Sequence, residues 1–166
     1  MVTLIVILGL LQDVPAPPPQ PPPVRGDRFQ LMVPQGWKTL NDGGFVLLQH
    51  SSGASLLVQR ITRTVRISDY ARRQAERIMT PLGFAKLGEP QYFKGKQDES
   101  VQYEILGNRL AEPYRILYRV FRRDSGYFES IYEAPVARFE LLLTEAQGIA
   151  SSVQTIIAAP PRRTRR

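Results

Sequence analysis

The segment Phe45–Ile61, FVLLQHSSGASLLVQRI, decides the fold. Two apolar runs flank the three residues 51–53, which end on glycine and are typical of a β-hairpin loop. The pairs then expected across the hairpin are Phe45–Gln59, Val46–Val58, Leu47–Leu57 and Leu48–Leu56. Because both faces of this ribbon are apolar, we expect other elements to cover both of them.

The segment after the hairpin predicts an amphipathic helix over 68–80. Ser68 is expected to be its N-cap, with Asp69 in the first turn, and Pro81 and Gly83 end it. The predicted apolar stripe is Ala71, Ala75, Ile78 and Leu82, and the predicted exposed face is Arg72, Arg73, Glu76 and Arg77.

Strands account for most of the remaining chain. One is expected over 29–33 before the hairpin, and others follow over 84–87, 91–94, 100–106, 114–123 and 127–134. The last two are expected to pair through a three-residue loop, Asp124-Ser125-Gly126. Apolar residues then recur at helical spacing from Val136 to Ile156, which predicts a helix of about 21 residues.

The predicted fold class is therefore α+β, with a central antiparallel sheet flanked by helices and a long C-terminal amphipathic helix. The positions expected to be buried are Trp37, Leu48, Leu56, Val58, Ile116, Tyr118, Phe139, Leu142, Ala146 and Ile149.

The two chain ends differ in composition from the middle. Residues 1–12 form a hydrophobic, signal-like or anchor segment, and residues 13–27 a proline-rich linker with half of the 14 prolines. We expect residues 28–159 to be the folded domain and residues 160–166 a basic disordered tail. This tail supplies four of the seven net positive charges, so the domain itself is mildly basic.

The apolar run Val2–Leu11 is about half as long as a bilayer-spanning helix. It fits the core of an export signal, although no Lys or Arg precedes it and no Ala-x-Ala site follows it. A membrane or partner anchor and a buried element are the alternatives. We expect a secreted or periplasmic protein, tethered through its N-terminus in the anchor case, with the proline run as a spacer of about 28 Å.

The order of these elements comes with four local motifs: Phe29-x-Leu-x-Val-Pro-x-Gly-Trp37, Gly53-Ala-Ser-Leu-Leu-Val58, Ser68-Asp-Tyr70 and Ser151-Ser152-Val153. Over nearly all of residues 28–158 the chain resembles the PsbP superfamily, which includes an extrinsic photosystem II subunit, a Ran-binding nuclear import factor and DcrB-like bacterial envelope proteins. The resemblance implies an α/β/α sandwich and a non-enzymatic accessory or docking role.

Catalytic and cofactor-binding patterns are missing from the sequence. There is no cysteine, and His50 is the single histidine, which excludes thiolate chemistry and disfavours a metal site. Neither a Gly-x-Ser-x-Gly elbow nor a glycine-rich phosphate loop occurs. We therefore predict no enzyme activity, catalytic residue, metal, cofactor or small-molecule substrate.

The strand 114–123 carries the one candidate binding surface. Its outer face reads Arg115, Leu117, Arg119, Phe121 and Arg123, a basic stripe suited to an anion or a partner. The predicted hairpin register places Glu129 diagonal to Arg119, and Glu133 diagonal to both Arg115 and Arg119, which would neutralise much of the stripe. The candidate site residues are Arg115, Arg119, Phe121 and Arg123, together with Arg162, Arg163, Arg165 and Arg166 of the tail.

Two binding hypotheses and one catalytic hypothesis follow. The favoured one is an envelope-associated accessory subunit that binds a protein complex at the membrane surface. The alternative is an arginine-dependent binder of anionic lipid or nucleic acid, of which nucleic acid is the less favoured. A small hydrolase is the least favoured, since no pair of carboxylates is expected to share a pocket.

Overall fold

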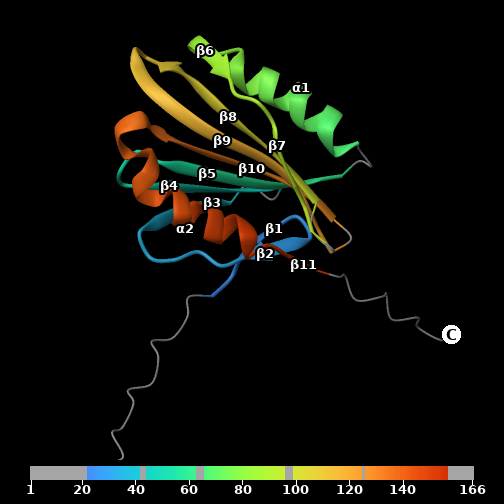
Figure 1. Cartoon of the computed structure of the whole chain (residues 1–166). Helices are drawn as coiled ribbons and strands as arrows, with labels where there is room; N and C mark the ends of the chain where they lie inside the picture. The colour runs from blue at the N-terminus through green and yellow to red at the C-terminus, as the bar shows by residue number, and fades with distance from the viewer. Residues whose placement is uncertain (1–21, 42–43, 63–65, 96–98, 125, 157–166) are drawn as a thin grey trace, which may run out of the picture.

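A computed structural model describes residues 22–41, 44–62, 66–95, 99–124 and 126–156. Within them the main sheet is antiparallel, in the order β3-β4-β5-β10-β9-β8-β6, and β7 pairs with β8 (Figure 1). Its strands are β3 Trp37–Asn41, β4 Phe45–His50, β5 Ser55–Ile61, β6 Gly83–Leu87, β7 Gln91–Lys94, β8 Glu99–Arg109, β9 Glu112–Arg123 and β10 Gly126–Pro135. The predicted α+β class is confirmed.

The β4–β5 hairpin has the predicted register. Gly53 takes a left-handed φ of 87°, which glycine adopts without strain, and the His50 amide donates to the Ala54 carbonyl at 2.9 Å. The expected cross-strand pairs are all present: Phe45–Gln59, Val46–Val58, Leu47–Leu57 and Leu48–Leu56.

Helix α1, Ile67–Met79, lies where the sequence predicts it. Ala71 and Ala75 are fully buried, and the four charged residues of the predicted outer face are exposed. The predicted cap is wrong, because the helix begins one residue before Ser68. The N-cap position is Arg66, and it makes no side-chain cap hydrogen bond.

The C-terminal helix is shorter than predicted. A 3₁₀ turn, Val136–Arg138, leads into α2, Phe139–Ser151, which has 13 residues. The Ser152 hydroxyl then bonds to two backbone groups, accepting from the Met32 amide at 2.8 Å and donating to the Ile149 carbonyl at 2.7 Å. These bonds hold the chain where it leaves the helix and enters a strand.

That strand, β11 Gln154–Thr155, belongs to a small sheet. β2, Phe29–Leu31, lies at its centre between β11 and β1, Val24–Gly26. β1 falls inside the predicted linker, so the ordered backbone begins before residue 28. The small sheet packs under β3 and β4 through β1.

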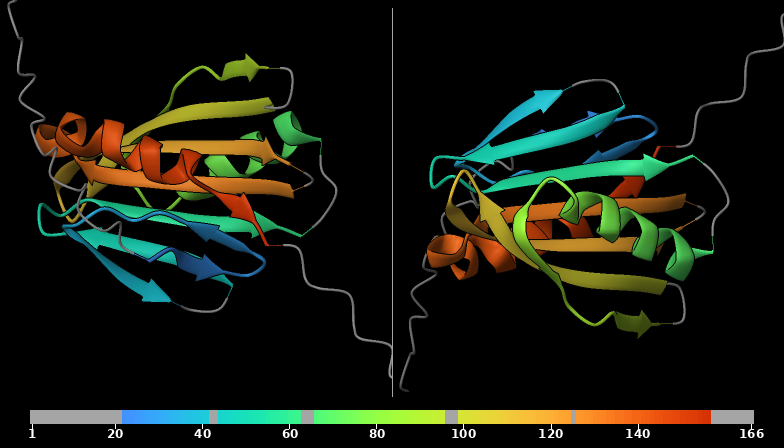
Figure 2. Two further views of the ribbon diagram at one scale, coloured as in Figure 1. Left: turned by 90° about the horizontal axis from the view of Figure 1, so that it is seen from below. Right: turned by 90° about the horizontal axis from the view of Figure 1, so that it is seen from above.

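Two apolar clusters lie on opposite faces of the main sheet. On β9, Leu117 and Phe121 pack with α2, whereas the alternate residues Ile116, Tyr118 and Val120 pack with α1. The α2 face is covered by α2 and the small sheet together. α1 contacts β8, β9 and β6, and it leaves β3, β4 and most of β5 without a helix on its side, since at β5 only the end at Ile61 packs in the α1 cluster (Figure 2). The expected coverage of both faces is therefore incomplete.

The predicted core is largely confirmed. Of the ten positions expected to be buried, nine are at most 8% exposed, while Leu142 is partly buried against the α2 cluster. The Trp37 indole is 8% exposed and donates to Glu145 Oε1 at 3.0 Å. It thereby ties β3 to α2.

Candidate functional site

The β9–β10 hairpin decides which charged side chains share a face. Arg123 pairs with Gly126, so two residues separate the strands in place of the expected three. A shift of one residue moves every side chain of β10 to the other face. Glu129 therefore pairs with Val120, on the face opposite to the arginine stripe. The diagonal contacts expected between the stripe and Glu129 or Glu133 are wrong.

Other acids neutralise Arg115. Its Nε lies 2.8 Å from Glu104 Oε1, and its Nη1 lies 2.5 Å from Glu140 Oε1. The guanidinium also sits 4.3 Å above the Phe139 ring. Hydrogen bonding to Glu104 and Glu140 raises the pKa of Arg115, against an opposing effect of burial. An arginine held by two carboxylates has little capacity left for an external anion.

The other predicted site residues are only partly at the surface. Arg119 Nη2 donates to Ser100 Oγ at 3.1 Å, and Arg119 and Arg123 are both half-buried. Phe121 is 3% exposed and stacks on Phe128 with ring centroids 5.8 Å apart, so it belongs to the core and not to a surface. The four predicted tail residues lie outside the described part of the chain: Arg162, Arg163, Arg165 and Arg166.

The α1 face contains a buried carboxylate that the sequence patterns do not reveal. Glu129 is 4% exposed. Tyr118 Oη donates to its Oε2 at 2.7 Å, Tyr70 Oη donates to its Oε1 at 3.2 Å, and Gln59 Nε2 also donates to Oε1. Three neutral donors thus satisfy a group whose burial would otherwise be costly.

Burial and the neighbouring carboxylate also act on the tyrosines. They raise the pKa of Tyr118 far above its ordinary value and that of Tyr70 to about 12. Both hydroxyls therefore remain protonated at neutral pH. The adjacent cavity of about 280 Å³ is lined in part by Gln59, Tyr70 and Glu129. Since both carboxylate oxygens already accept hydrogen bonds, the cluster is suited to holding β10 against α1.

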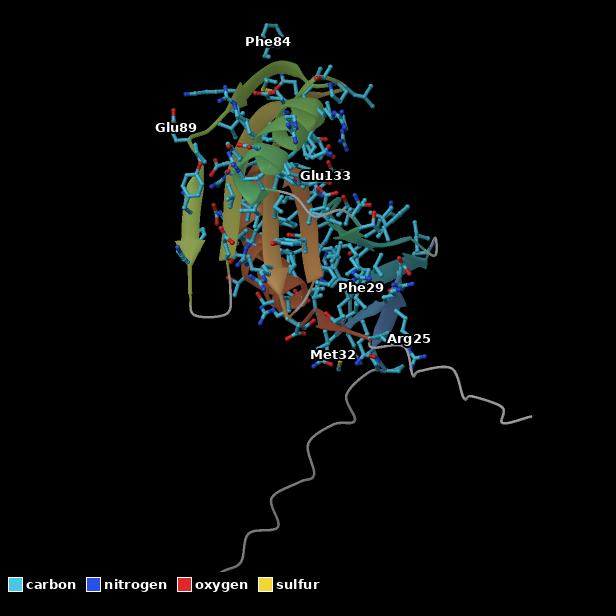
Figure 3. All side chains as sticks on the ribbon, turned by 90° about the vertical axis from the view of Figure 1, so that its right-hand side faces the viewer. Arg25, Phe29, Met32, Phe84, Glu89 and Glu133 are labelled. Atoms are coloured by element: carbon cyan, nitrogen blue, oxygen red, sulfur yellow. The ribbon has the colours of Figure 1, made fainter. Side chains whose placement is uncertain are left out.

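Glu133 lies on the same face and pairs with a different arginine. Its two oxygens accept from Arg109 Nη1 at 2.8 Å and Nη2 at 2.9 Å (Figure 3 labels Glu133). No group of three His, Cys, Asp or Glu side chains that could hold a metal occurs among the residues described. In the same part of the chain, no helix is long and apolar enough to cross a membrane.

The uncovered half of the α1 face carries an apolar row. Cross-strand pairing aligns Leu40, Leu47, Leu57 and Ile131 over β3, β4, β5 and β10. Leu40 is 42% exposed, and the other three are half-buried, as is Phe45 beside them. Ile131 packs against the α1 cluster and forms the inner end of the row. We call the surface formed by these five residues the open face.

The open face ends at an edge strand. β3 is the last strand of the main sheet, and in the described residues it pairs with β4 alone. Sequence reasoning missed β3, because Trp37-Lys-Thr-Leu-Asn41 is short and mixes polar with apolar residues. The alternation of Trp37, Thr39 and Asn41 with Lys38 and Leu40 is the only signal that could have revealed it.

Solved structures with the same arrangement of strands and helices identify the fold. CyanoP, the cyanobacterial PsbP of Synechocystis sp. PCC 6803, matches 78% of this chain over 87% of its own length, with a TM-score of 0.53 and 15% identity. The chain has the PsbP-like fold. The resemblance expected from the sequence is confirmed at this level.

Two other solved structures share the PsbP-like fold with this chain. LpqN of Mycobacterium tuberculosis, involved in cell envelope biogenesis, covers 78% of the chain and 83% of its own length, with a TM-score of 0.54 and 10% identity. PA94 of Pseudomonas aeruginosa, a protein of unknown function, covers 79% and 92%, with a TM-score of 0.51 and 16% identity. Comparison with protein-family models and with curated proteins gives no match.

Proposed function

We propose that this protein is a non-enzymatic accessory module of the cell envelope that docks onto a protein partner through its open face. The observation that carries the proposal is the apolar row from Leu40 to Ile131, which begins on the edge strand β3 and leaves 42% of Leu40 exposed. Apolar residues grouped on one uncovered part of a sheet, rather than scattered singly, mark a candidate interaction site.

The open face suits a small element of a partner. In this proposal the fold is an α/β/α sandwich whose α1 layer is incomplete. The partner occupies the part of the sheet, over β3, β4 and most of β5, that α1 leaves uncovered. Four strands about 4.8 Å apart by about five residues of about 3.3 Å each give roughly 300 Å², well below the roughly 800 Å² that each partner buries in a standard stable complex. A single helix over the leucines, or a strand added to β3, fits this area.

The envelope location rests on two observations. Residues 1–23 combine an apolar run with a proline-rich spacer, as in exported or tethered proteins. LpqN, which has the same fold, is involved in cell envelope biogenesis. We therefore propose a secreted or periplasmic protein whose partner belongs to a complex at the membrane surface.

The competing hypothesis, in which the arginine stripe binds anionic lipid or nucleic acid, has less support. Arg115 is engaged by Glu104 and Glu140, and Phe121 is buried, so the stripe offers a broken basic surface. Binding of nucleic acid through this stripe would require several phosphate contacts in a row.

A charge placed on the open face tests the proposal. Leu40→Glu should lower the amount of partner that co-purifies with the tagged full chain from its own cells by about tenfold or more, because the complex would bury an unpaired carboxylate. Leu106→Glu is the matched control, since Leu106 is 39% exposed and pairs with Arg115 on the other face.

Both variants should keep the wild-type melting temperature within a few degrees, because neither replaced side chain is buried. Co-purification that is lost in Leu40→Glu and kept in Leu106→Glu supports docking at the open face. If both variants recover the same partner in equal amounts, the open face is not the docking site.

A further inference from the structure

The two ends of the described chain both belong to the small sheet. Gln30 of β2 pairs with Arg25 of β1 on one side and with Gln154 of β11 on the other. Two strand spacings separate these neighbours, or about 10 Å. The Ile156 amide also donates to the Arg28 carbonyl at 2.8 Å. Because β1 and β11 run in the same direction beside β2, the described chain enters the small sheet at its Leu31 end and leaves it at its Arg28 end, and both points lie below α2 (Figure 1).

The sequences that continue from these two points are complementary to one kind of surface. Upstream lies the apolar run Val2–Leu11, and downstream lie four arginines between 162 and 166. A bilayer with anionic headgroups favours both, since apolar residues enter the interface and each basic residue near it gains roughly 1 kcal/mol. One weak anchor is marginal by itself, whereas an apolar segment combined with a basic cluster gives stable binding.

The described surface between the exits is itself basic. Arg25 and Arg28 are both exposed in the β1–β2 hairpin, where Asp27 subtracts one charge (Figure 3 shows Arg25 near Phe29). The ring of Phe29 contacts that of Phe128 with centroids 5.6 Å apart.

That ring contact joins the hairpin to the ends of β5 and β9. Phe128 pairs with Arg60 of β5 and with Phe121, two residues before Arg123 of β9. Arg60 and Arg123 are half-buried on this side. They extend the basic rim beyond the hairpin.

An apolar groove lies on the same side. It holds about 400 Å³ between α2 and the segment after β2, and its lining includes Met32, Val33, Pro34 and Ile149. Gly148 forms part of it, and a Cβ added there would meet no atom within 4 Å. Glu145 also lines the groove, where its Oε1 accepts a hydrogen bond from Trp37 Nε1. The groove leaves a stretch of α2 at Gly148 uncovered.

We infer that the side formed by the small sheet and α2 lies against an anionic bilayer, held by the two chain ends and by Arg25 and Arg28 between them. The open face belongs to the opposite face of the main sheet. A domain bound in this orientation presents its docking surface away from the lipid.

Vesicle binding by the full chain tests the inference. The probes are phosphatidylcholine vesicles with and without phosphatidylglycerol, in co-sedimentation over a salt series. Arg25→Gln combined with Arg28→Gln should weaken partition onto the anionic vesicles by up to about 30-fold, or about fivefold per arginine. Glutamine at positions 162, 163, 165 and 166 should weaken it further.

The matched control is Arg72→Gln combined with Arg73→Gln, which removes the same charge from the exposed face of α1. Those residues lie on the far side of the main sheet, so screening should limit their effect to less than about twofold at physiological salt. Equal losses from the two pairs would mean that net charge alone matters, and would overturn the orientation. Binding that is as tight without phosphatidylglycerol would overturn the anionic requirement.

Discussion

At the scale of single residues, Glu129 shows how a carboxyl group is accommodated inside this sheet. It is 4% exposed and accepts hydrogen bonds from Tyr118, Tyr70 and Gln59. Since an unsatisfied buried acceptor costs more than a hydrogen bond gains, each of these donors matters for stability. Tyr118 is itself fully buried, so water cannot easily replace its hydroxyl.

Tyr118→Phe should therefore lower the free energy of unfolding by about 1–3 kcal/mol in denaturant titrations. Tyr103→Phe is the matched control, because Tyr103 pairs with Tyr118 on the next strand and donates no hydrogen bond to Glu129. A cost for Tyr118→Phe no greater than that of the control would show that the hydroxyl does not stabilise the carboxylate.

The same tyrosines predict the alkaline limit of stability. Burial first, and Glu129 second, raise the pKa of Tyr70 to about 12 and that of Tyr118 further, while burial raises the pKa of Tyr132 to about 12. A raised folded pKa contributes stability that is complete below the unfolded value of about 10 and is lost as the pH rises from there toward 12.

Urea unfolding at several pH values measures this loss. We expect the free energy of unfolding to fall above pH about 10, and Tyr118→Phe to reduce the slope by about one proton. A slope unchanged in Tyr118→Phe would contradict the assignment to this residue.

One glycine explains why the sequence predicts the β4–β5 pairing and fails for β9–β10. Both loops read as three residues that end in glycine, but only Gly53 takes the left-handed φ. Gly126 lies in β10, where an added Cβ would come within 2.8 Å of the Phe128 ring. Gly126 is therefore needed to make room for the Phe128 ring. The residue in the left-handed turn position is Asp124, with φ 52°. Sequence spacing alone does not separate these two uses.

At the scale of elements, helical periodicity predicts α2 but not its end. Val153 is 2% exposed and continues the apolar pattern, although the helix stops at Ser151. The stop depends on Ser152 bonding to Met32, a residue 120 positions away. A long-range contact of this kind also creates β11, which pairs with β2. β1 pairs locally with β2, and both strands are too short to carry a pattern of their own.

Gly148 gives a prediction for α2. Gly148→Ala should raise the free energy of unfolding by about 0.5–1 kcal/mol, because an added Cβ meets nothing and alanine loses less entropy in a helix. Gly107→Ala is the opposite control, since its Cβ would lie 2.9 Å from Leu82 Cβ and should destabilise. A loss of stability in Gly148→Ala would mean that the helix is more closely packed there.

At the scale of the whole molecule, the two faces of the main sheet are covered to different extents. α2 and the small sheet cover one face of the main sheet, whereas on the other face α1 packs mainly on β6, β8 and β9 and reaches β10 through Tyr70 and Glu129. The sequence predicts a ribbon apolar on both faces, but not that one of them stays half-exposed. That outcome depends on where α1 lies, which hydrophobic patterning does not determine. The position of α1 leaves the apolar row that begins at Leu40 partly exposed.

Cysteine labelling in cell envelopes tests the docking claim most directly. The chain has no cysteine, so Leu40→Cys and Leu106→Cys each provide a single thiol, at positions that are 42% and 39% exposed. In the purified protein both should react with a maleimide at similar rates. In cell envelopes solubilised in mild detergent, so that lipid shields neither position, we predict that Leu40→Cys is protected several-fold relative to Leu106→Cys, because the partner covers the open face. A ratio of labelling that is the same in envelopes as in the purified protein would contradict the account.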